Sequence, residues 1–123
     1  MSRIEVGGVS TTIYKICDAA LWRDAEAAGT FRGAGIDMHD GYIHFSTAGQ
    51  VKETAARHFA GMSGLLLIAI DAGRLGAVLR WEPAREGALF PHLYGELPLA
   101  SVLWVKPLLL DADGQHVFPE LVS

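Results

Sequence analysis

The chain has 123 residues, half of them hydrophobic, and a formal net charge of −4 at pH 7. That length is typical of one domain, and it is enough to bury a core without cross-links. Lysine and arginine are scattered along the chain, which excludes a general nucleic-acid-binding surface, and no apolar run is long enough to cross a membrane.

The first segments in chain order predict a strand followed by a helix. Residues 1–10 show no period and are expected to form a loose lead-in to one α+β domain over residues 11–123. Residues 11–16 are rich in β-branched and aromatic side chains, which favour a strand. Asp18 is a suitable N-cap for a helix that Gly29 can end.

The next segments predict a long loop, a short strand and a second helix. Residues 29–41 contain four glycines and are expected to form a loop. Residues 42–46 alternate, which places Tyr42, His44 and Ser46 on the face opposite the core. Thr47 and Gln50 fit a capping box, which predicts a helix that starts at Thr47.

The second half of the chain predicts further strands. Residues 65–70 form a continuous apolar run, and residues 77–82 follow so closely that the two segments are expected to pair antiparallel. Residues 92–97 and 102–110 also read as extended, with Pro107 marking an edge or a bend. The fold class predicted is therefore α+β, with two helices packed on a mainly antiparallel sheet.

Two groups of polar side chains are candidates for a functional site. The first is His44, Ser46 and Thr47, because the N-terminus of the following helix can bind a phosphate or carboxylate. The second is His92, Tyr94 and Glu96, which share one face if the segment is extended and can supply acid–base chemistry. We predict that His44 and His92 line one cleft. The alternatives are ordinary helix capping and an exposed polar strand face.

The histidines and the single cysteine bear on metal binding and on the compartment of the protein. His39, Asp40, His44 and His92 are the residues that a metal site would need, but their spacing is loose, so no metal is expected. Cys17 is the single cysteine and cannot form an internal disulfide, and no secretory signal pattern is seen. We therefore expect a cytoplasmic protein.

Five strings of the sequence carry a resemblance to a known family: IYKI at residues 13–16, LW at 21–22, DGYIHFST at 40–47 followed by Gln50, WE at 81–82, and FPHLYG at 90–95. They resemble those of a small bacterial family, domain of unknown function 952. The resemblance spans roughly residues 14–109, and the third and fifth strings are its most specific part.

A more distant resemblance is to the ADP-ribosyltransferase-like fold, which includes the RNA 2′-phosphotransferases. It implies a cleft in a split antiparallel sheet, with NAD as a substrate. The matching positions are Tyr14 and Lys15, then residues 44–47, then residues 92–96 with Glu96 as the late carboxylate. This sequence departs from the pattern at Lys15, which stands in place of the usual His or Arg.

Three functions stay open at this point. The first is a transferase of ADP-ribosyl or phosphotransferase type, in which His44, His92 and Glu96 are catalytic. The second is a non-catalytic binding or interaction module, and the third is a metal-dependent enzyme. The ligand-binding residues expected for the first are Tyr14, Lys15, Asp40, Tyr42, Ser46, Thr47 and Tyr94.

Overall fold

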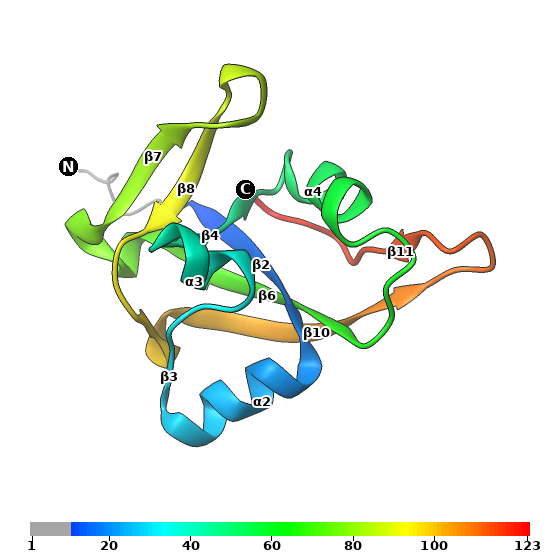
Figure 1. Cartoon of the computed structure of the whole chain (residues 1–123), viewed down its shortest axis with the longest axis horizontal. Coiled ribbons are helices and arrows are strands. Elements are labelled where there is room, and N and C mark those ends of the chain that lie inside the picture. Colours follow the sequence, from blue (N-terminus) through cyan, green and yellow to red (C-terminus); the bar gives the residue numbers. More distant parts are fainter. Residues whose placement is uncertain (1–10) are drawn as a thin grey trace.

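Three long antiparallel strands form the centre of the molecule. The computed structural model describes residues 11–123, so the lead-in expected over residues 1–10 lies outside the described residues. Strand β6 (Leu65–Asp71) lies between β2 (Thr12–Asp18) and β10 (Val102–Leu110), and it pairs with both along nearly its whole length (Figure 1). Its apolar run is buried on both faces.

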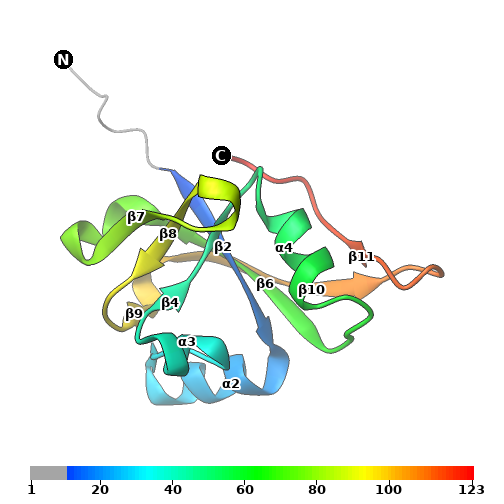
Figure 2. The same cartoon turned by 45° about the horizontal axis from the view of Figure 1, so that its top comes forward.

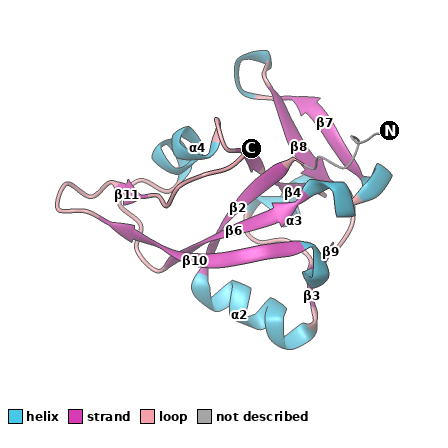
Figure 3. Ribbon diagram, turned by 180° about the vertical axis from the view of Figure 1, so that it is seen from behind, coloured by secondary structure: helices cyan, strands magenta, loops and turns pink. Residues whose placement is uncertain are grey.

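Within residues 11–123 the strands form three sheets, and every pairing is antiparallel. This arrangement confirms the α+β class and the mainly antiparallel pairing of the strands (Figure 3). The five-stranded sheet has the order β11-β10-β6-β2-β5, the three-stranded sheet β4-β8-β7, and the small pair β3-β9. The bounds of the remaining strands are β3 Thr30–Phe31, β4 Ile43–His44, β5 Ser46–Thr47, β7 Leu79–Pro83, β8 Leu89–Leu93, β9 Leu97–Pro98 and β11 His116–Val117.

The alternation of β2 places core side chains on both faces of the large sheet. Ile13 and Cys17 belong to one apolar cluster, which includes Trp22 of helix α2 (Ala19–Ala28). Tyr14 and Ile16 belong to a second cluster, which includes Val51 and Ala55 of helix α4 (Val51–His58) and is joined by Phe118 and Leu121 of the tail. The two helices therefore cover different faces of the same strands (Figure 2).

Helix α2 begins and ends where the sequence predicts. The Asp18 carboxylate accepts hydrogen bonds from the backbone N–H groups of Ala20 and Leu21, which satisfies two of the free donors of the first turn. At the other end Gly29 has φ 87°, the left-handed conformation that glycine adopts without strain.

Two predictions about the first half of the chain are wrong. The glycine-rich segment is not one continuous loop, because it contains β3 and a short helix, α3 (Ile36–Asp40). The second helix begins at Val51 rather than directly after Thr47, because Ser46 and Thr47 pair with β2 as strand β5. One of the two hydrogen bonds of the predicted capping box is present, because the Gln50 side chain accepts from the Thr47 N–H at 3.0 Å.

The predicted pairing of residues 65–70 with residues 77–82 is also wrong. Strands β2 and β10 already pair with the two edges of β6. After β6 the chain forms short 3-10 turns over Ala72–Arg74 and Gly76–Val78, and β7 begins outside the large sheet. Strand β7 pairs with β8 instead. The extended segment predicted at residues 92–97 is β8, which starts at Leu89 and ends at Leu93. Strand β10 is extended over residues 102–110, as predicted, and it continues through Pro107.

No helix within residues 11–123 is long and apolar enough to cross a membrane.

Candidate functional site

A cleft of about 670 Å³ lies beside β2, between helices α2 and α3 on one side and the end of α4 on the other. Its wall is apolar where Leu21, Ile36, Phe59 and Met62 line it, and polar where the β7–β8 hairpin approaches. Five of the residues singled out in the sequence line this cleft: Lys15, Asp40, His44, Ser46 and His92.

His44 and His92 lie side by side, which confirms that they line one cleft. They are opposite each other in the register of β4 and β8, and their ring centroids are 5.4 Å apart. The Tyr42 ring packs on both imidazoles, at 4.6 Å from His44 and 4.3 Å from His92, and on Tyr94 at 5.1 Å. Four of the predicted residues thus form one aromatic cluster: Tyr42, His44, His92 and Tyr94.

Carboxylates hold both ring nitrogens of His44. Nδ1 is 2.6 Å from Asp37 Oδ1, and Nε2 is 2.9 Å from Asp40 Oδ2. Because an ionised carboxylate only accepts hydrogen bonds, both contacts are satisfied when the ring carries two protons. The two carboxylates therefore fix the orientation of the His44 ring in the cleft.

Asp37 is a buried carboxylate that organises the network around His44. Its second oxygen forms an ion pair of 2.7 Å with Lys15 and accepts from the Ala34 N–H, and its first oxygen also accepts from the His44 N–H. Burial alone disfavours the charged form, but the hydrogen bond from His44 and the charge of Lys15 outweigh it, and the pKa of Asp37 falls to about 2. Lys15 also donates to the His44 carbonyl at 3.0 Å.

His92 has a different environment from His44. Its Nδ1 donates to Glu82 Oε1 at 2.8 Å, and the Tyr94 hydroxyl donates to the same oxygen at 2.7 Å. These hydrogen bonds lower the pKa of the Glu82 carboxyl, and the contact with Glu82 raises the pKa of the Tyr94 phenol. Nε2 of His92 has no hydrogen-bond partner among residues 11–123, although the side chain is 6 % exposed and lines the cleft.

Five of the predicted residues do not line the cleft: Tyr42 and Tyr94 belong to the aromatic cluster with the two histidines, and Tyr14, Glu96 and Thr47 lie elsewhere. Tyr14 lies in the second core cluster and donates its hydroxyl proton to the Val122 carbonyl, because alternation along β2 turns it to the opposite face from Lys15. Glu96 is half-exposed and pairs with Arg32 at 3.0 Å, so it cannot act with His92. Thr47 does not line the cleft, and its N–H is bound by Gln50.

Ser46 and Cys17 line the cleft but do not offer a reactive group. The Ser46 hydroxyl is 2.9 Å from that of Thr54, and the backbone of Ser46 pairs with β2 rather than capping a helix. Burial, with smaller contributions from Asp18 and Asp37, raises the pKa of the Cys17 thiol to about 11 against the opposing charge of Lys15. The thiol is therefore protonated at neutral pH and is not a nucleophile.

Sequence reasoning missed three charged residues of the site: Asp37, Glu82 and Arg85. Asp37 falls in the segment expected to be a loop, and no local pattern connects it to Lys15. Glu82 shares a face with Arg80 on β7, and Arg80 is opposite His92 in the β7–β8 register, so a correct strand pairing would have indicated it. No group of three His, Cys, Asp or Glu suited to a metal ion occurs among residues 11–123.

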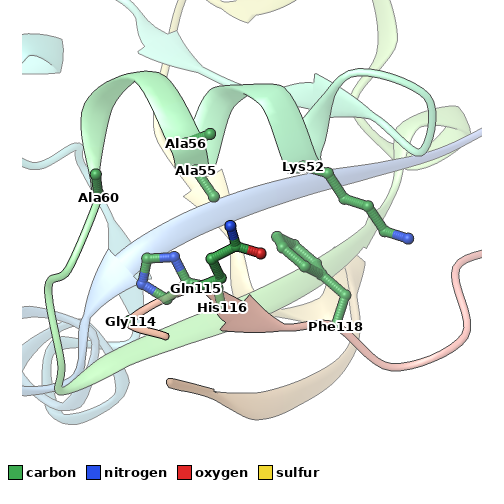
Figure 4. Close-up of a pocket in the computed structure, with 8 residues that line it drawn as sticks. All are labelled: Lys52, Ala55, Ala56, Ala60, Gly114, Gln115, His116 and Phe118. Atoms are coloured by element: carbon green, nitrogen blue, oxygen red, sulfur yellow. The ribbon is translucent and has the colours of Figure 1, made fainter. Parts of the chain in front are cut away.

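A second hollow, of about 390 Å³, lies between α4 and the segment around β11 (Figure 4). Ala55 and Ala56 of α4, and Ala60 just after the helix, line it together with Gln115, His116 and Phe118. None of the residues predicted to be functional lines this hollow, and His116 is occupied by a hydrogen bond to the Met62 carbonyl. The chemistry is therefore concentrated in the larger cleft.

The family described as Protein of unknown function (DUF952) matches residues 16–105, which include most of the cleft. The chain belongs to this family. The crystal structure of protein CC0527 from Caulobacter crescentus is 47 % identical, with a TM-score of 0.84, over 87 % of this chain and 94 % of that one. The solution NMR structure of the same protein has 47 % identity and a TM-score of 0.76, and the match covers 85 % of this chain and 90 % of that one. No curated protein matches the chain.

Proposed function

We propose that this DUF952 chain is a small enzyme of transferase type whose cleft binds a phosphorylated nucleoside such as NAD or ADP-ribose. The observation that carries the proposal is His92, a buried imidazole that lines the cleft with Nδ1 held by Glu82 and with Nε2 unpartnered among the described residues. A histidine held in this way by a carboxylate is suited to accept or donate a proton at Nε2.

The shape and lining of the cleft support a ligand with a planar or apolar part and a polar part. Its volume of about 670 Å³ is in the usual range for small-molecule sites. The apolar part of the lining, which includes Leu21, Ile36 and Phe59, suits a base or a nicotinamide ring, and the imidazoles of His44 and His92 suit hydroxyl groups.

In the ADP-ribosyl version of the reaction, the bond between nicotinamide and ribose breaks and an acceptor oxygen bonds to the ribose carbon. Nicotinamide leaves with the bonding electron pair, and the proton of the acceptor passes to His92 Nε2. Asp40, held by His44 at the cleft wall, is the carboxylate placed to oppose the positive charge that develops on the sugar. It takes the role that the sequence assigns to Glu96.

Titration of isotope-labelled protein with ADP-ribose and NAD tests ligand binding. We expect backbone amide shifts to concentrate in residues 34–46 and 90–94, with little change at residues 115–118 beside the second hollow. His92→Ala should weaken binding by about 1–3 kcal/mol, because a buried hydrogen bond is lost. His116→Ala, a histidine outside the cleft, is the matched control. Absent or evenly spread shifts at millimolar ligand would rule out the nucleotide.

Release of nicotinamide from NAD then tests catalysis. The proposal predicts turnover that His92→Gln abolishes while the amide shifts persist. Binding without any turnover in the unmodified protein would favour the non-catalytic binding module instead.

A further inference from the structure

The guanidinium of Arg85 lies at the polar end of the cleft and has no part in the chemistry assigned to the two histidines. Arg85 belongs to the 3-10 turn Arg85–Gly87, at the tip of the hairpin that joins β7 to β8. Its side chain is 14 % exposed, lines the cleft and stacks over the ring of Phe90, 4.8 Å from the centroid. This stacking fixes the direction of the guanidinium.

The positive charge of Arg85 is poorly neutralised. Lys15 and Arg85 are the lysine and arginine residues that line the cleft in the described part of the chain. The charge of Lys15 is matched by Asp37 at 2.7 Å. The acid beside Arg85 is Glu53, 3.8 Å away, and Glu53 is shared with Arg57 at 2.8 Å. Arg85 is therefore the cation that remains available to a ligand.

Two hydroxyl groups adjoin this guanidinium on the cleft wall. Arg85 donates from one terminal nitrogen to Thr54 Oγ1 at 3.2 Å, and Thr54 Oγ1 is 2.9 Å from Ser46 Oγ. Thr54 donates in turn to the Gln50 carbonyl at 3.2 Å, and Ser46 is buried. A guanidinium carries five N–H donors in a planar fork, so most of the Arg85 donors are free for oxygen atoms of a ligand.

We propose that Arg85, Thr54 and Ser46 form an anion subsite that binds a phosphate group of the cleft ligand. The subsite makes the cleft selective for phosphorylated over unphosphorylated forms of the same compound. A phosphate oxyanion meets a guanidinium through paired, charge-assisted hydrogen bonds. The proton of the Thr54 hydroxyl is given to the Gln50 carbonyl, so Thr54 holds the guanidinium in place, and the Ser46 hydroxyl can turn its proton from Thr54 Oγ1 to a ligand oxygen. The inference rests on the proposed function for the position of the ligand, and it moves phosphate binding from the start of a helix to the tip of a hairpin.

A comparison of AMP with adenosine tests the subsite. The unmodified protein should bind AMP at least about tenfold more tightly than adenosine, since one charge-assisted pair is worth that much. In Arg85→Gln the two affinities should become similar, with adenosine affinity unchanged. Arg57→Gln is the matched control, because it removes the same charge from the same partner, Glu53, but does not line the cleft. It should keep the preference for AMP.

The outcomes separate this proposal from the wider one. If AMP and adenosine bind equally well in the cleft, or Arg85→Gln keeps the preference, the subsite is wrong and the nucleotide cleft stands. If neither AMP nor adenosine binds, a titration with inorganic phosphate tests the subsite by itself. Phosphate should then shift the resonances of the Arg85 Nε–H and of the Ser46 and Thr54 amides, and the amide shifts should disappear in Arg85→Gln. This result would support the anion subsite and contradict the proposal that the cleft ligand is a nucleotide. No shift with phosphate would overturn the subsite as well.

Discussion

The buried carboxylate of Asp37 shows how one residue can set the geometry of a site. It accepts hydrogen bonds from Lys15, His44 and two backbone N–H groups, and these partners come from β2, β4 and the segment before α3. A charge this deeply buried is tolerated only when it is paired and hydrogen-bonded. The same contacts fix the position of His44 in the cleft.

Removal of the Asp37 charge should destabilise the protein strongly. Asp37→Asn leaves the Lys15 ammonium buried without a counter-charge, and breaking a buried pair in this way costs about 3–5 kcal/mol. Urea denaturation measures the loss. The double variant Lys15→Met/Asp37→Asn should recover much of it, because no unpaired charge remains. A single variant that loses less than about 1 kcal/mol would contradict the assigned role.

The lowered pKa of Asp37 predicts a loss of stability in acid. A group whose folded-state pKa lies below its unfolded value stabilises the fold above the unfolded value, and this stability is lost as pH falls through the folded value. For Asp37 the unfolded value is 3.8 and the folded value is about 2, so the contribution of about 2 kcal/mol should be complete above about pH 5 and fade towards pH 2. Denaturation of the unmodified protein and of Asp37→Asn across this range should show their difference shrinking. A constant difference would disagree with the assignment.

At the scale of elements, local signals were sufficient for some parts of the chain and not for others. Helix α2 is predictable because Asp18 and Gly29 mark its ends within the segment itself. The start of α4 is not, because the strand pairing of Ser46 with Tyr14, far away in the sequence, competes with the capping box. The partner of β7 depends on which edges of β6 are already occupied, and no short-range pattern contains that information.

The candidate site also has parts that local sequence patterns predict and parts that depend on distant strand pairing. Alternation along residues 42–46 and the extended segment around His92 brought the two histidines into one cleft. The choice of Glu96 failed because β8 ends at Leu93, so the side-chain alternation does not continue to residue 96. Glu82 takes its place from the neighbouring strand, and Asp37 reaches the site through a helix that the glycine-rich composition concealed.

The turn before α3 supports Asp37 through a close approach at Gly33. Gly33 has φ 117°, and a Cβ at this position would lie 2.9 Å from the Asp37 Cβ. Gly33→Ala should therefore strain the backbone and push Asp37 away from His44, at a cost of about 2 kcal/mol or more. Gly41→Ala is the control, since Gly41 also has positive φ but has no atom within 4 Å of the added Cβ. Urea denaturation and the His44 ring resonances measure the two effects. Equal losses with unchanged His44 signals would refute the clash.

The molecule as a whole divides into a well-buried large sheet and a more exposed small one. Strand β6 is flanked on both edges and covered on both faces, whereas β7 is an edge strand with Trp81 40 % exposed. The cleft lies where the two meet: β2 supplies Lys15, and β8 supplies His92. Opening of the small sheet can thus change the site without unfolding the core.

Native-state hydrogen exchange should reveal this difference. Amides of β6 are expected to exchange only through global unfolding, because both of its neighbours must separate first. Amides that join β7 to β8 should exchange through a local opening with a free energy lower by at least about 2 kcal/mol. The variant Trp22→Ala, which empties part of the core beside α2, should lower the free energy of exchange for β6 by about 3–5 kcal/mol. The same variant should leave the free energy of exchange of the β7–β8 amides unchanged, as long as the free energy of global unfolding stays above that of the local opening. If both sheets exchange with one common free energy in the unmodified protein, the molecule is a single cooperative unit and the site cannot open independently.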